Sequence, residues 1–232
     1  MKRTVMGCAL AASALALVAG PPAEAQDLQQ KVAAAKQSAA QNQQALRTYT
    51  WLEKTELSLK GEVKNTTVSS CRYGPDGKVQ KTQVSEPPPP QEKKRGLKGK
   101  AIAKKTGEMK AEMQAAVALV HQYVPPSPDK IQAAMAAGKI TVAPGAGTTA
   151  LRIADYQKAG DSLVLTLDTA AKGMKQIDVD TWMESPSDKV TLTVQMQSLP
   201  DGTSSAGTVV LAIPSSQIHV RITNSDYQKL AP

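Results

Sequence analysis

The sequence predicts an α+β fold built on one broad, curved antiparallel sheet, half-barrel-like, whose concave face is covered by an N-terminal helix and an inserted pair of helices. Two observations support this fold class. Apolar and polar residues alternate through most of the second half of the chain, and helical spacing is confined to one segment near the N-terminus and one in the middle. A sheet with one apolar face has to bury that face against another layer, and the helices supply the remaining apolar surfaces.

The elements follow in order along the chain. Residues 27–47 are rich in Ala, Gln and Lys and have the thin apolar stripe of an amphipathic helix. From Thr50 the apolar period changes to two, and the sequence GPDG at 74–77 predicts a tight turn between two strands. Later runs of alternating residues predict strands at 163–167, 177–183, 190–196, 209–213 and 218–222.

Residues 86–147 interrupt the strand pattern and predict a helical insertion that begins with a loop rich in Pro and Lys. Apolar residues recur at helical spacing through 109–124, and a second helix has Ser127 as its N-cap, Pro128 in its first turn and Gly138 at its end. We expect the four consecutive prolines to stiffen the exit from the sheet. Residues 26–232 are therefore predicted to form a single domain.

Residues 1–25 have the pattern of a cleaved signal peptide. Lys2 and Arg3 precede an apolar stretch, and the segment ends in Ala-Glu-Ala. The apolar stretch is shorter than the roughly 20 residues that a membrane span needs. We therefore expect a periplasmic or secreted protein. Loss of this segment leaves Cys71 as the one cysteine, for which we expect a structural role as a buried thiol.

The formal net charge of +8 is concentrated in one region, residues 91–110. A local patch differs from the broad basic surface of a protein that coats nucleic acid, so no nucleic-acid partner is predicted. Two interpretations stay open: a solvated loop, or a contact for an anionic surface such as phospholipid head groups. The cations that would make this peripheral membrane contact are Lys93, Lys94, Arg95, Lys98, Lys100, Lys104 and Lys105.

No catalytic, cofactor-binding or metal-ligating group is predicted, and the chain is not expected to be an enzyme. Asp178 and Asp180 point to the same side of one strand, which fits a solvated face better than an acid and base on either side of a substrate bond. His121 and His219 lack partners at ligand spacing. Trp182 shares the polar phase of its strand, so it either contacts a partner or packs on a neighbouring loop.

The order of elements, an N-terminal helix, a meander, a helical insertion and a longer meander behind an export signal, resembles the LolA-like fold group of bacterial envelope proteins. That group includes periplasmic lipoprotein carriers, lipid-binding lipoproteins of mycobacteria and a lipoprotein-sensing regulator of envelope stress. The segments SCRYGPDGKVQKT, KKRGLKGK, HQYVPP, LPDGT and ITNSDYQKL also resemble a family of uncharacterised exported bacterial proteins. The first resemblance implies a hollow that holds acyl chains between sheet and helices.

Two hypotheses follow, both non-enzymatic. In the first, the protein binds or carries a lipid or a lipoprotein acyl chain. The residues expected to line its hollow are Met109, Met113, Val117, Val120, Val190, Leu192, Val194 and Met196. In the alternative, these side chains fill the core, as protein interiors usually are filled, and the chain is a structural or interaction protein that binds an envelope protein. The sequence does not indicate an oligomeric state.

Overall fold

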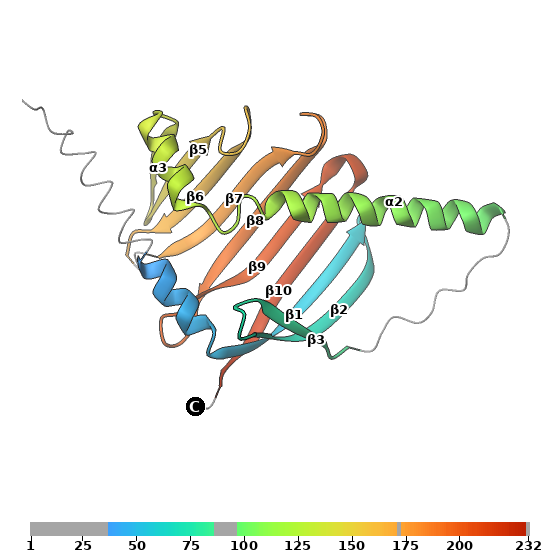
Figure 1. Ribbon diagram of the computed structural model, residues 1–232, viewed down its shortest axis with the longest axis horizontal. Coiled ribbons are helices and arrows are strands. Elements are labelled where there is room, and N and C mark those ends of the chain that lie inside the picture. Colours follow the sequence, from blue (N-terminus) through green and yellow to red (C-terminus); the bar gives the residue numbers. More distant parts are fainter. Residues whose placement is uncertain (1–36, 86–96, 171–172, 231–232) are drawn as a thin grey trace, which may run out of the picture.

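The computed structural model describes residues 37–85, 97–170 and 173–230 and shows one open antiparallel sheet with helices lying across one face (Figure 1). The ten strands follow the order β3-β2-β1-β10-β9-β8-β7-β6-β5-β4. The predicted α+β class is confirmed, and this is the architecture that the resemblance to the LolA-like group implies. The predicted signal peptide and the start of the predicted N-terminal helix lie outside the described residues.

Each element has the following bounds. The strands are β1 (Tyr49–Leu59), β2 (Glu62–Tyr73), β3 (Val79–Gln83), β4 (Ile140–Gly145), β5 (Thr148–Ala154), β6 (Ser162–Asp168), β7 (Met174–Trp182), β8 (Lys189–Ser198), β9 (Ser204–Ile213) and β10 (Ile218–Lys229). The helices are α2 (Leu97–Val120), α3 (Pro128–Ala136) and the short 3-10 helix η1 (Pro214–Ser216). Residues 37–46, ahead of β1, are also helical.

The two edges of the sheet are β3 and β4, which are consecutive strands in the chain. The segment that contains α2 and α3 therefore has to cross the whole sheet between them, as Figure 1 shows. From β4 the chain returns strand by strand, and β10 pairs with β1. This pairing joins the first and last strands of the chain in the middle of one sheet.

The strand register places apolar side chains in rows across the helix-facing side of the sheet. One such row, read through successive cross-strand pairs, is Leu57, Val220, Leu211, Leu192, Val179, Leu163, Ile153 and Ile140. The row one residue further along is mostly polar and consists of Glu56, Arg221, Val210, Thr193, Asp178, Val164, Arg152 and Thr141. Because side chains alternate between faces, one face is apolar and the other largely polar.

The main core lies between the carboxyl-terminal end of α2 and the central strands. Ala116 is fully buried, and Val120 packs into the same cluster as Leu163, Val190 and Leu192. A second packed cluster lies near the start of β1 and contains four of the seven aromatic residues: Tyr49, Trp51, Tyr73 and Tyr227. Cys71 is the buried free thiol beside this cluster, as expected for a structural cysteine.

The structure corrects the description of the insertion at 86–147 in two respects. Its end is already sheet, because β4 occupies 140–145 and β5 follows, and neither strand was predicted. Their alternation is obscured by Pro144, Gly145 and several alanines, which are tolerated because β4 is an edge strand exposed along most of its length. The basic segment is also not all loop, since α2 begins at Leu97 and includes Lys98, Lys100, Lys104 and Lys105.

Candidate functional site

A cleft of about 640 Å³ lies beneath the middle of α2. We call it the α2 cleft. Three segments distant in sequence form it: the turn between β1 and β2, one side of α2, and the corner between β9 and β10. Its lining residues are Leu59, Lys60, Glu62, Lys64, Lys105, Thr106, Glu108, Met109, Glu112, Ser215, Ser216, Gln217 and Ile218. In Figure 1 the ends of β1 and β2 lie below the middle of α2, and the amino-terminal part of the helix extends past them.

Two tight turns form the lower edge of the α2 cleft. Lys60 and Gly61, between β1 and β2, both have positive φ angles, +54° and +81°. Gln217, which ends η1, also has a positive φ of +53°. The backbone N–H of Lys60 donates to the carbonyl of Gln217 at 2.9 Å and so ties the two turns together. The two-residue Lys-Gly connection matches the turn type that suits the twist of a hairpin.

The floor of the α2 cleft is apolar and its rim is charged. Leu59, Met109 and Ile218 form the floor, and all three pack against or belong to the main core. On the rim, Lys64 pairs with Glu62, and the hydrogen bond from Lys64 holds the pKa of that carboxyl below its ordinary value.

Two rim lysines are left for a ligand. The ammonium groups of Lys60 and Lys105 make no ion pair or hydrogen bond with the residues that the structure describes. Lys105 is exposed on α2, and its neighbour Lys104 instead pairs with Glu108 at 3.8 Å. The α2 cleft therefore combines an apolar floor with a rim of three lysines and three glutamates. The glutamates have partners, whereas Lys60 and Lys105 have none among the described residues, and these two lysines suit the head group of an amphipathic anion.

The position of α2 is fixed by contacts at two places. Near its middle, Ser216 of η1 donates a hydrogen bond to Glu112. Just beyond its end, the hydroxyl of Tyr123 lies 2.5 Å from a carboxylate oxygen of Asp161 and 2.7 Å from the hydroxyl of Thr181. Burial, assisted by Asp161, raises the pKa of Tyr123, so the hydroxyl stays protonated and donates. These contacts keep the helix over the sheet, and the first of them lies at the α2 cleft itself.

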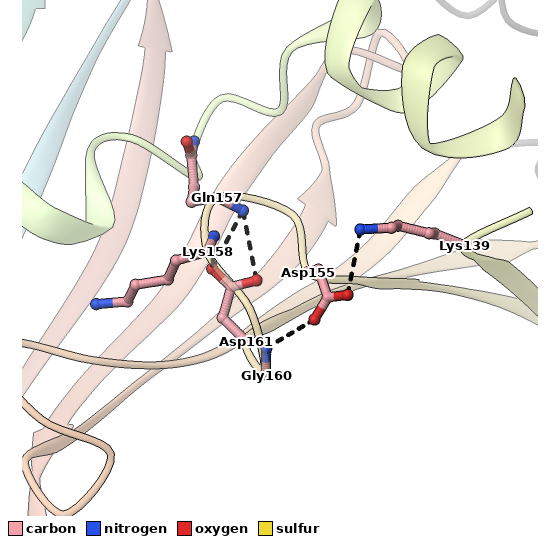
Figure 2. Close-up of polar contacts among 6 residues, drawn as sticks. All are labelled: Lys139, Asp155, Gln157, Lys158, Gly160 and Asp161. Carbon is pink, nitrogen blue, oxygen red and sulfur yellow. Dashed lines mark hydrogen bonds and ion pairs between the residues drawn. The ribbon is translucent and has the colours of Figure 1, made fainter. Parts of the chain in front are cut away.

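Asp161 organises the loop between β5 and β6 that receives Tyr123. Figure 2 shows its carboxylate directed at the backbone of Gln157 and Lys158, whose N–H groups donate at 3.1 and 3.0 Å. On the other side of the loop, Asp155 accepts from the backbone of Gly160 at 2.6 Å and from Lys139 at 3.2 Å. These two bonds lower the pKa of Asp155, the one from Gly160 most. The loop is thus a rigid support for the end of α2.

The eight residues proposed to line a hollow do not form one surface. Val120, Val190, Leu192 and Val194 are buried in the main core, and Met196 packs against it. Met113 is half-buried, whereas Val117 has 38% of its surface exposed. Of the eight, Met109 alone lines the α2 cleft. The layer beneath the carboxyl-terminal end of α2 is packed, and the space lies beneath the middle of the helix.

The proposed anionic-surface cations and Trp182 are placed as follows. Lys93, Lys94 and Arg95 lie outside the described residues, while Lys104 and Lys105 are exposed on α2. Trp182 is half-buried: its ring lies 3.4 Å from where a side chain on Gly160 would begin, and the ammonium of Lys158 sits 4.5 Å from its ring centre. Of the two interpretations of Trp182, packing on a neighbouring loop is the one that its contacts match.

Sequence reasoning missed most of the lining of the α2 cleft. The turn at Lys60 was predictable, because a Lys-Gly pair between two alternating runs indicates a tight hairpin. No local sequence pattern indicates Ser216 and Gln217, since their role depends on where the β9–β10 corner lies relative to α2. Within the described ranges, no group of three or more His, Cys, Asp or Glu side chains is placed to hold a metal ion. None of the described helices has the length and apolar character to cross a membrane.

Comparison with known proteins gives weak structural likenesses. No family model matches the chain, and no curated protein does. A DUF1329 family protein from Desulfovibrio piger is 11% identical, with 86% of this chain and 93% of that chain covered and a TM-score of 0.39. A domain assigned provisionally to outer membrane lipoprotein sorting, from Vibrio parahaemolyticus, is 10% identical over 87% and 92%, with a TM-score of 0.40.

A LolA superfamily protein from Nitrosomonas europaea is 6% identical over 85% of this chain and 94% of that chain, with a TM-score of 0.35. The last two names fall in the group that the order of elements resembles. All three TM-scores are below 0.5, and a likeness at this level supports no functional inference. The function of this chain therefore has to follow from its own contacts.

Proposed function

We propose that the protein is a periplasmic binding or carrier protein that holds one acyl chain of a lipid or lipoprotein in the α2 cleft. The observation that carries this proposal is a cleft of about 640 Å³ with an apolar floor continuous with the core and two free lysines at its mouth. Its volume is within the range of roughly 300–1,000 Å³ that small-molecule sites occupy. We propose no enzymatic role for it.

The lysines determine which end of the ligand faces outward. An acyl chain laid on Leu59, Met109 and Ile218 would bring its polar end to Lys60 and Lys105 at the rim. The exposed lysines of α2 extend this positive charge along the helix toward a membrane surface. Each lysine near an anionic membrane contributes about 1 kcal/mol of attraction, which supports a peripheral contact during loading or delivery.

The test is lipid binding by the full mature chain. We expect lipid extraction and mass spectrometry of the protein purified from a bacterial envelope to recover single-chain or acylated species. In a titration with lysophospholipids, an anionic head group should bind more tightly than a zwitterionic one. Met109→Trp, which fills the floor, should weaken binding at least tenfold, whereas Gln114→Trp, on the exposed side of the same helix, should change it less than twofold.

Two results would refute the carrier proposal. One is recovery of no lipid together with no rise in melting temperature on adding lysophospholipid. The other is equal binding by both tryptophan variants, because a chain held in the cleft has to sense its floor.

The second candidate, an envelope interaction protein, is favoured by the packed layer beneath the second half of α2. Val120, Val190 and Leu192 leave no hollow at the place where sequence reasoning put one. A protein of this kind would bind its partner through an exposed surface of the sheet or its helices. Failure of both lipid assays would favour this function.

A further inference from the structure

A second hollow, of about 400 Å³, lies at the turn between β2 and β3. We call it the arginine hollow. Its lining residues are Arg47, Arg72, Tyr73, Gly74, Pro75, Gln80 and Leu230, and none of these is acidic. It is separate from the α2 cleft: Thr50 pairs with Arg72 at one end of β1, and Leu59 pairs with Glu62 at the other. Nine residues of strand span roughly 30 Å at about 3.3 Å each.

The guanidinium of Arg47 lies against a glycine of the β2–β3 turn. A side chain on Gly77 would begin only 2.7 Å from Nη2 of Arg47, so the guanidinium lies directly against the turn backbone. Gly77 also has a φ of +75°, a conformation that other residues rarely adopt. The turn is therefore shaped to admit the Arg47 side chain.

Arg72 is oriented from the facing strand. Its Nε donates to Oε1 of Gln80 at 3.4 Å, and the two residues are direct cross-strand partners in β2 and β3. This bond uses one of the five N–H groups of the guanidinium and leaves the terminal pair for a ligand. The acid of the same turn, Asp76, accepts from the backbone of Lys78 at 3.1 Å and does not line the hollow.

Neither arginine is neutralised by the part of the chain that the structure describes. The Arg47 side chain makes no ion pair or hydrogen bond there, and Arg72 makes only its bond to Gln80. Tyr73 also lines the hollow, and its ring packs against Trp51 with the ring centres 5.5 Å apart. Burial raises the pKa of Tyr73, against the opposing effect of Arg47, so its hydroxyl remains a donor. Pro75 and Leu230 supply apolar surface beside these donors.

We propose that the arginine hollow binds a phosphate monoester. Two guanidinium groups line this one hollow, and neither has a carboxylate partner among the described residues, so their charge and their N–H groups match the oxygens of a phosphoryl group. A phosphate monoester carries about −1.5 to −2 charge at pH 7, which balances two arginines, whereas a carboxylate balances one. The apolar wall indicates an organic ester. It belongs either to a soluble phosphorylated molecule or to a lipid head group such as phosphatidic acid.

The experiment measures binding of phenyl phosphate to the full mature chain by calorimetry, with benzoate as the matched carboxylate. We expect one site, with phenyl phosphate bound at least tenfold more tightly than benzoate. Arg47→Gln and Arg72→Gln should each weaken it at least tenfold. Lys78→Gln is the control: it removes the same charge from an exposed residue of the same turn that does not line the hollow, and should change binding less than twofold.

Arg47→Lys keeps the charge without the fork and should also weaken binding, which covers the case in which Arg47→Gln fails to fold. Flotation with phosphatidylcholine vesicles, with and without phosphatidic acid, distinguishes a lipid head group from a soluble phosphorylated molecule. Binding only to vesicles that contain phosphatidic acid, lost in both arginine variants, identifies a lipid head group. The proposal is overturned by equal losses in Arg47→Gln and Lys78→Gln, by benzoate binding as tightly as phenyl phosphate, or by no binding to any of these probes.

Discussion

At the scale of single residues, Asp161 decides how the helical cover is attached. Only 2% of its surface is exposed, and its carboxylate accepts from the Tyr123 hydroxyl and from the backbone of Gln157 and Lys158. A buried carboxylate is tolerated only when hydrogen bonds replace its lost water, and here three donors do so. The bond from Tyr123 joins the β5–β6 loop to the segment that follows α2, and the other two hold the loop itself together.

We therefore expect Asp161→Ala to lower the free energy of unfolding by about 3 kcal/mol or more, because it leaves three donors without a charged acceptor in the interior. Urea denaturation measures this change. Asp180→Asn is the matched control, since Asp180 is exposed on the other face of the sheet, and it should cost less than about 0.5 kcal/mol. Equal effects of the two substitutions would contradict the role given to Asp161.

At the scale of elements, α2 is a long helix with a narrow contact. Most of its described residues are exposed, and the buried ones, Ala116 and Val120, lie in its second half. Ala116 contributes because it is small, which lets the helix approach the sheet closely. The middle of the helix then covers the α2 cleft without filling it.

Ala116→Leu should destabilise the protein by about 1–3 kcal/mol, because three added carbons have no room in a packed layer. Ala115→Leu, at the neighbouring exposed position, should leave stability within about 0.5 kcal/mol and so serves as the control. Thermal and urea unfolding of the two variants provide the comparison. If Ala116→Leu were as stable as Ala115→Leu, the helix would not be packed as the structure has it.

At the scale of the whole molecule, the pairing of β1 with β10 makes one sheet out of the two ends of the chain. The strands before α2 and those after α3 are hydrogen-bonded into this one sheet, so no boundary separates the two groups. We propose that residues 26–232 form a single domain that unfolds as one cooperative unit. The two tryptophans report on the two groups, since Trp51 lies in β1 and Trp182 in β7.

In Trp182→Phe, the remaining Trp51 reports on β1 and its contact with Tyr227 of β10, and in Trp51→Phe, the remaining Trp182 reports on the strands after α3. Within each variant, the fluorescence transition in urea should coincide with the transition in far-ultraviolet circular dichroism, as a two-state process requires. Two separated midpoints within either variant would show that the strands on the two sides of the helical segment unfold independently.

Much of the fold could be predicted because its central strands are buried on one face. In β8, Val190, Leu192 and Val194 alternate with threonines, and this period of two survives in the sequence because each strand has a packed neighbour on both sides. The edge strand β4 lacks that constraint, so Pro144 and Gly145 are tolerated and the pattern is lost. Local periodicity thus records how deeply a strand is buried.

The candidate site was not predictable in the same way, because no local pattern records which distant segments meet. Sequence alone determined the one-sided sheet, the helical insertion and the place of the positive charge. Tertiary structure alone decided that Leu59, Met109 and Ile218 share a floor and that Arg47 and Arg72 line one hollow. Alternation is set by each residue's own burial, whereas these groupings are set by strand order and by the path of α2 across the sheet.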